Sequence, residues 1–109
     1  MTRYADQPDT VDQMRADFLA ALGHEYLAVP GRRRAADRLP AVPGMPDFFV
    51  TAHGRTPVAV LFMQAAHGGR NPTTRQADFL RRLAAAGWRT TVAYSVSDAL
   101  DFLHIGGKQ

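Results

Sequence analysis

The sequence predicts a small α/β (α+β) domain in which a mixed β-sheet is flanked by helices. Two apolar runs, residues 47–52 and 57–63, are separated by the turn-forming residues 53–56, a pattern typical of a β-hairpin. Residues 71–86 have helical periodicity, and the segment 88–94 that follows is strand-like and rich in Thr and Val. Because a helix joins the last two strands, we expect them to pair in parallel through a right-handed crossover, which makes the sheet mixed.

Length and composition indicate one globular domain. The chain has 109 residues, of which 46% are hydrophobic and 21% charged, so a packed core is expected. We expect this domain at residues 9–104, with a flexible tail at 1–8 and a short C-terminal tail at 105–109. The sequence has no apolar stretch long enough for a membrane span, no signal peptide and no cysteine. A cytoplasmic protein is the simplest interpretation.

The first predicted helix begins at Asp9 or Thr10, either of which can act as its N-cap, and ends near Gly23. Apolar residues recur along it at three- to four-residue spacing, at Val11, Met14, Phe18 and Leu22. Residues 24–29 are short and apolar enough for a strand or an extended link. Residues 31–46 are rich in Arg, Pro and Gly and are expected to form a long loop with room for one helical turn.

The second predicted helix starts with Asn71 as N-cap and Pro72 as its first residue, and Gly87 ends it. Its apolar stripe consists of Phe79, Leu80, Leu83 and Ala84. Ser95 and Asp98 match a capping box for a last helix, whose residues Leu100 and Leu103 are expected to face inward.

A proline-aspartate pair, Pro46-Asp47, stands at the start of a predicted strand, and a second apolar strand reaches Leu61 14 residues later. Further motifs follow a recognisable order along residues 10 to 103: Gly31-Arg32-Arg33, Val42-Pro43-Gly44-Met45-Pro46-Asp47, Gly68-Gly69-Arg70, Gln76, Ala85-Ala86-Gly87-Trp88 and Ser95-Val96-Ser97-Asp98-Ala99-Leu100. By their order and spacing they resemble the VRR-NUC family of the PD-(D/E)xK nuclease superfamily. The resemblance implies a restriction-endonuclease-like core and, for a protein of one small domain, a homodimer.

The chemistry of this superfamily depends on a divalent metal ion, which polarises the phosphate and generates hydroxide. Magnesium or manganese is held by hard oxygen ligands, one of which is the motif aspartate. A second carboxylate lies two residues before a lysine on the next strand, and strand alternation places both side chains on one face. The lysine orients the attacking water or stabilises the developing charge.

This chain lacks two of these three groups. Asp47 matches the motif aspartate, but the second carboxylate position falls on Leu61 and the lysine position on Met63. A shifted register does not help, because no Asp or Glu lies between Asp47 and Asp78 and the only lysine is Lys108. The sequence therefore predicts a nuclease-like scaffold in which Leu61 and Met63 are core residues. With Leu and Met in place of a carboxylate and a lysine, the fold avoids the desolvation cost of two buried charges.

Other carboxylates could hold a metal ion in part. Glu25, the only glutamate, lies near the first helix, where the family often carries a carboxylate that helps to bind metal. With Asp47 it would form a weak metal site, and Asp12 or Asp17 could act in its place. The alternative for Asp47 is a structural one, a cap on the turn after Pro46.

The charge of the missing lysine could come from Arg55 or Arg70, although an arginine stays protonated and is a poor activator of water. Gln64 could offer a neutral oxygen, but alternation points it to the face opposite Leu61 and Met63. The histidines have no metal-ligand spacing and are expected on the surface or in loops: His24, His53, His67 and His104.

The basic residues are almost all arginine. Net charge is +3, and because one of the thirteen Lys and Arg residues is lysine, twelve are arginine. Guanidinium groups can bind phosphate through planar bidentate contacts, and a solvated arginine-rich surface is the alternative. The candidate contacts to nucleic acid are Arg32, Arg33, Arg34, Arg70, Arg75 and Arg82.

Three functions follow as hypotheses. The favoured one is a VRR-NUC-like protein without catalysis and without a cofactor, which binds nucleic acid such as branched DNA, or a partner protein. The second is an active DNA endonuclease with a relocated site, which would use magnesium or manganese. The third is a phage- or defence-related module that inhibits a protein partner. Whether Leu61 and Met63 are natural or engineered also stays open.

Overall fold

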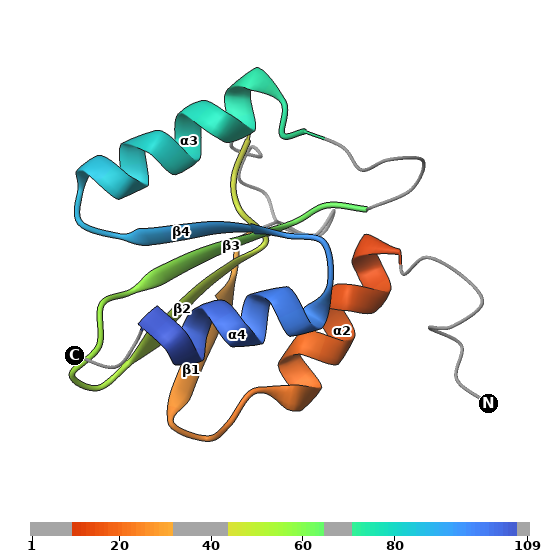
Figure 1. The fold of residues 1–109 in the computed structure, drawn as a ribbon, viewed down its shortest axis with the longest axis vertical. Coiled ribbons are helices and arrows are strands. Elements are labelled where there is room, and N and C mark those ends of the chain that lie inside the picture. Colours follow the sequence, from red (N-terminus) through yellow and green to blue (C-terminus); the bar gives the residue numbers. More distant parts are fainter. Residues whose placement is uncertain (1–9, 32–43, 65–70, 107–109) are drawn as a thin grey trace, which may run out of the picture.

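The computed structural model describes residues 10–31, 44–64 and 71–106 (Figure 1). Helices and strands follow one another in the order that the sequence predicts. In chain order they are α2 (Val11–Ala21), β1 (Tyr26–Pro30), β2 (Phe48–Ala52), β3 (Val58–Phe62), α3 (Thr74–Ala85), β4 (Arg89–Ala93) and α4 (Val96–Gly106).

The four strands form one sheet in the order β1-β2-β3-β4. β1 pairs antiparallel with β2, β2 antiparallel with β3, and β3 parallel with β4. The predicted mixed sheet is therefore confirmed, and the segment left open as strand or link is strand β1. All five residues of β3 are buried, as expected of a central strand between two neighbours and two layers of helices.

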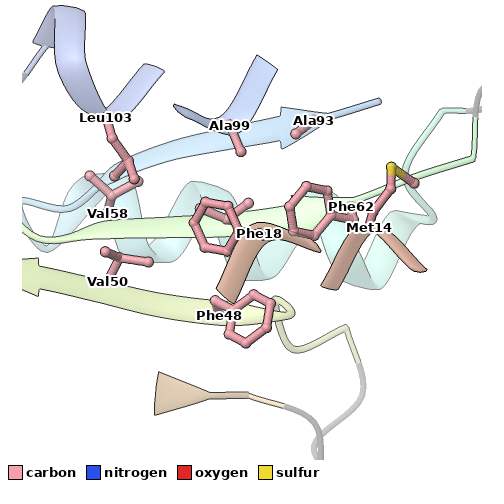
Figure 2. Close-up of a cluster of buried hydrophobic side chains, with 10 residues drawn as sticks. Met14, Phe18, Phe48, Val50, Val58, Phe62, Ala93, Ala99 and Leu103 are labelled. Carbon is pink, nitrogen blue, oxygen red and sulfur yellow. The ribbon is translucent and has the colours of Figure 1, made fainter. Parts of the chain in front are cut away.

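Helices cover both faces of the sheet (Figure 1). On one face, α2 and α4 pack over the large core, in which Phe18 lies against Phe48 and Phe62 with ring centroids 5.4 and 5.5 Å away (Figure 2). The buried members of the large core are Met14, Phe18, Phe48, Val50, Val58, Val60, Phe62, Ala93, Ala99 and Leu103. On the other face, α3 covers a small core of Ala59, Leu61 and Leu80, joined by Phe49, Met63, Leu83, Trp88 and Val92.

The helix starts are set by local hydrogen bonds. Thr10 is the N-cap of α2, and its side chain accepts from the backbone N–H of Gln13. For α3 the predicted start at Asn71 is wrong. Thr73 is the N-cap, because it forms a reciprocal capping box with Gln76 that satisfies two backbone N–H groups at once. The predicted stop at Gly87 holds, with a φ of 101° that favours glycine.

The capping of α4 differs slightly from the prediction. The Ser95 hydroxyl accepts from the backbone N–H of Asp98, as in a capping box. The Asp98 carboxylate, however, accepts from the backbone N–H of Tyr94, whereas a capping box would use the N–H of Ser95. Leu103 is buried and Leu100 packs against the large core, as expected. The helix continues to Gly106, two residues into the predicted C-terminal tail.

The predicted tail at 1–8 and most of the predicted loop at 31–46 lie outside the described residues. Among the described residues, no helix has both the length and the apolar composition that crossing a membrane requires.

Candidate functional site

Asp47 lies directly before β2, where its backbone is fixed by both neighbouring strands. Its N–H donates to the carbonyl of Val60 in β3 (2.9 Å), and its carbonyl accepts from the N–H of Gly31, the residue after β1 (2.8 Å). Position 31 accommodates only glycine, because a Cβ there would lie 2.1 Å from the carbonyl oxygen of Pro46. The chain at this point is therefore packed too closely for a larger residue, and Asp47 is 2% exposed.

Both oxygens of the Asp47 carboxylate accept hydrogen bonds from the protein. Oδ1 accepts from Nε of Arg15 in α2 at 2.7 Å, and Oδ2 accepts from the backbone N–H of Phe62 in β3 at 2.7 Å. The Asp47 side chain is 1% exposed and the Arg15 side chain 22% exposed, so this is a largely buried ion pair. It ties α2 to the sheet where β2 begins and β3 ends.

Arg15 is the one residue of this arrangement that the sequence does not single out. It also pairs with Asp12, one turn earlier on α2, whose side chain is 90% exposed. The i, i+3 spacing of Asp12 and Arg15 is visible in the sequence. Nothing in the sequence pairs Arg15 with a carboxylate 32 residues later, because that contact depends on how α2 packs on the sheet.

This geometry makes Asp47 a structural carboxylate. A buried carboxylate needs a charge partner and hydrogen bonds, and Arg15 and Phe62 supply both. A divalent cation at the same oxygens would lie beside the guanidinium of Arg15 and be repelled by it. The predicted structural role differs in form: Asp47 does not cap the turn after Pro46, since its donors come from α2 and β3.

Leu61 and Met63 are core residues, as predicted. Leu61 is 3% exposed and packs in the small core with Ala59 and Leu80, and Met63 packs against the same cluster. Both side chains therefore share one face of β3, the face covered by α3. Arg15 reaches Asp47 from α2, on the other face, so the three motif positions do not surround a common space.

Glu25 cannot complete a metal site with Asp47. Its neighbour Tyr26 pairs with Ala52, whereas the neighbour of Asp47, Phe48, pairs with Pro30 at the opposite end of β1. Gly31, whose N–H donates to the Asp47 carbonyl, is six residue steps from Glu25, and six steps along a strand span about 20 Å, far beyond a shared coordination sphere. The predicted pairing of Asp47 with Glu25 is therefore wrong.

The two α2 carboxylates named as alternatives to Glu25 both have partners on the same helix. Asp12 is bound to Arg15, and Asp17 accepts from the side chain of Gln13. Within the described residues, no three His, Cys, Asp or Glu side chains are grouped so that they could hold a metal ion.

Arg55, named as a possible substitute for the family's lysine, lies far from Asp47. Its Nη1 donates to the hydroxyl of Tyr26 at 2.6 Å, next to the β2–β3 turn and at the end of the sheet away from Asp47. Arg70 lies outside the described residues. Gln64 is half-buried just after β3, and the described histidines at 24, 53 and 104 are exposed, as expected.

The candidate nucleic-acid contacts divide into two groups. Arg75 and Arg82 are exposed on α3, together with Arg81. Arg81 and Arg82 both pair with Asp78, so three arginines and one aspartate leave this helix with a charge of +2. The remaining candidates lie outside the described residues: Arg32, Arg33, Arg34 and Arg70.

Comparisons with family models, curated proteins and solved structures return no match to this chain.

Proposed function

We propose that this chain is a VRR-NUC-like protein that has lost phosphodiester hydrolysis and binds nucleic acid, most simply DNA. The observation that carries the loss of catalysis is the ion pair between Asp47 and Arg15. In a nuclease of this type the motif aspartate holds a metal ion, but here a built-in guanidinium supplies the positive charge.

The neighbouring strand supports the same proposal. Residues 61 and 63 would have to supply a carboxylate and a lysine, and instead they fill the small core under α3. Charged groups at these buried positions would cost several kcal/mol in desolvation, of the order expected for unpaired buried ions. The apolar residues remove that cost and stabilise the scaffold, which still retains its mixed sheet and flanking helices.

The exposed face of α3 is the described surface that best suits a phosphate backbone. Arg75, Arg81 and Arg82 extend from it, and only Asp78 opposes their charge. Exposed ion pairs of this kind contribute little to stability, so their arginines can exchange a carboxylate for a phosphate at small cost.

The test is binding of linear and branched DNA duplexes over a series of salt concentrations. Affinity should fall as salt rises, and replacing both Arg75 and Arg82 by Gln should make the slope of log K against log salt less negative, by about 0.9 for each phosphate that is no longer neutralised. Asp78→Asn is the matched variant of opposite sign, because it removes the negative charge of the same face and should strengthen binding.

The other functions appear as distinct outcomes. Cleavage of DNA in the presence of magnesium or manganese, lost on Asp47→Ala, would establish the active nuclease and overturn the proposal. Affinity for DNA that does not depend on salt, or no affinity at all, would favour a protein partner. A homodimer and a cytoplasmic location belong to the same proposal, and sedimentation equilibrium of the whole chain tests the first of them.

A further inference from the structure

β1 lies at one edge of the sheet and has β2 as its one neighbour in the strand order. An edge strand presents N–H and C=O groups that can pair with a strand of another molecule. Two of the three exposed large apolar side chains in the described part of the chain also lie on β1, Leu27 at 64% and Val29 at 49% exposed. The strand at the other edge, β4, has no exposed residue. Of the four strands, β1 is therefore the one most suited to edge-to-edge association.

The direction of each N–H group in β1 follows from the pairing with β2. Gly31, the residue after β1, donates its N–H to Asp47, the residue before β2. N–H groups alternate in direction along a strand, so positions 27 and 29 also direct theirs toward β2. Positions 26, 28 and 30 consequently form the outer side of β1.

Two of these three outer positions cannot offer an N–H to another strand. Tyr26 already donates its N–H to the carbonyl of Gly23, in the turn before β1, at 3.1 Å. Pro30 has no N–H, and it is an exposed residue that belongs to neither core. Of the five residues of β1, Ala28 is thus the one that keeps an outward N–H for a new ladder.

We propose that Pro30 prevents a second copy of this chain from pairing with β1. Two antiparallel copies related by a two-fold axis at Ala28 would place Leu27 of one copy opposite Val29 of the other, a favourable apolar pair. In this register position 30 would donate to the carbonyl of Tyr26 in the other copy, and proline removes that donor at both ends of the ladder. The inference does not depend on the function proposed above, and the homodimer that belongs to that proposal would use another surface.

The test is Pro30→Val, which restores the N–H with a side chain that suits a strand. Sedimentation velocity over a concentration series compares this variant with the unchanged protein. The variant should self-associate at concentrations at least about tenfold lower, because each pair of copies gains two hydrogen bonds. Pro57→Val is the matched control: it replaces a proline directly before the central strand β3, away from the sheet edge, and should leave association unchanged.

Two further measurements connect association with β1. Hydrogen exchange of the Ala28 amide should slow as the concentration of Pro30→Val rises, because that N–H then donates to the second copy. Adding Leu27→Lys should reverse the association, because it places a charge on the paired apolar face. Pro30→Ala restores the same N–H and replaces the valine variant if circular dichroism shows that the latter is unfolded. Association equal to that of the unchanged protein, or association that Leu27→Lys leaves as it is, would overturn the proposal.

Discussion

Replacing Arg15 by leucine is expected to destabilise the fold far more than the loss of an ordinary surface charge. The substitution leaves the Asp47 carboxylate, 1% exposed, without its charge partner, while the hydrogen bond from the Phe62 N–H remains. Removing one partner of a buried ion pair costs about 3–5 kcal/mol. Because 22% of the Arg15 side chain is exposed, water can take over part of the role of the guanidinium, so we expect the lower end, about 3 kcal/mol.

The size of this effect is easily measured. For a domain of this size, 1 kcal/mol corresponds to a shift in Tm of about 4–8 °C, so Arg15→Leu should lower Tm by about 12–24 °C. Urea unfolding followed by circular dichroism gives the free energy directly. The matched control is Arg81→Leu, which also removes a helix arginine paired with an aspartate, but with a side chain that is 72% exposed; it should cost about 0.5 kcal/mol or less.

A double-mutant cycle separates the ion pair from other effects of the leucine. Asp47→Asn keeps an oxygen that can accept from Phe62 but removes the buried charge. In the Arg15→Leu background it should therefore cost about 2 kcal/mol less than in the unchanged protein. If Arg15→Leu costs no more than Arg81→Leu, or if the two substitutions are additive, the ion pair is not what holds Asp47 and the account of the site is refuted.

Three further substitutions test other parts of the structure. Leu61→Glu combined with Met63→Lys should lower the free energy of unfolding by more than about 3 kcal/mol, because the double substitution places charges in the small core. The variant should not cleave DNA with magnesium, and cleavage in a plasmid-nicking assay would contradict this. Phe18→Ala should cost about 3–5 kcal/mol in urea unfolding by opening a cavity against Phe48, whereas Leu19→Ala, at a residue 46% exposed, should cost much less; equal losses would contradict the assignment of the large core. Thr73→Ala should cost about 1 kcal/mol through loss of the capping box, and a thermal melt as stable as that of the unchanged protein would contradict it.

Local sequence patterns predict the elements of this fold well because local contacts create them. The continuous apolar run of β3 marks a strand buried on both faces, and alternation correctly places Leu61 and Met63 on one face. The start of α3 is missed because Asn71 and Thr73 are both good N-caps. Only the partner three residues further on, Gln76, distinguishes them.

The candidate site depends on contacts that no local pattern contains. Arg15 meets Asp47 because α2 crosses the sheet near the start of β2, and that packing is set by the large core. Glu25 is excluded because the register of β1 on β2 places it at the far end of the strand. Sequence spacing singles out Asp47, Leu61 and Met63, but not the Arg15 guanidinium that neutralises Asp47.

The most direct test of the account is whether a divalent cation binds at Asp47. Titration of the ¹⁵N-labelled protein with Mn²⁺, with paramagnetic broadening of the amide signals as the readout, measures this at each residue. Because Arg15 and the Phe62 N–H already occupy the carboxylate, the amides of Asp47 and Phe62 should show no saturable broadening. Saturable broadening of these two signals at low Mn²⁺ concentration, abolished by Asp47→Asn, would contradict the account and identify a metal site.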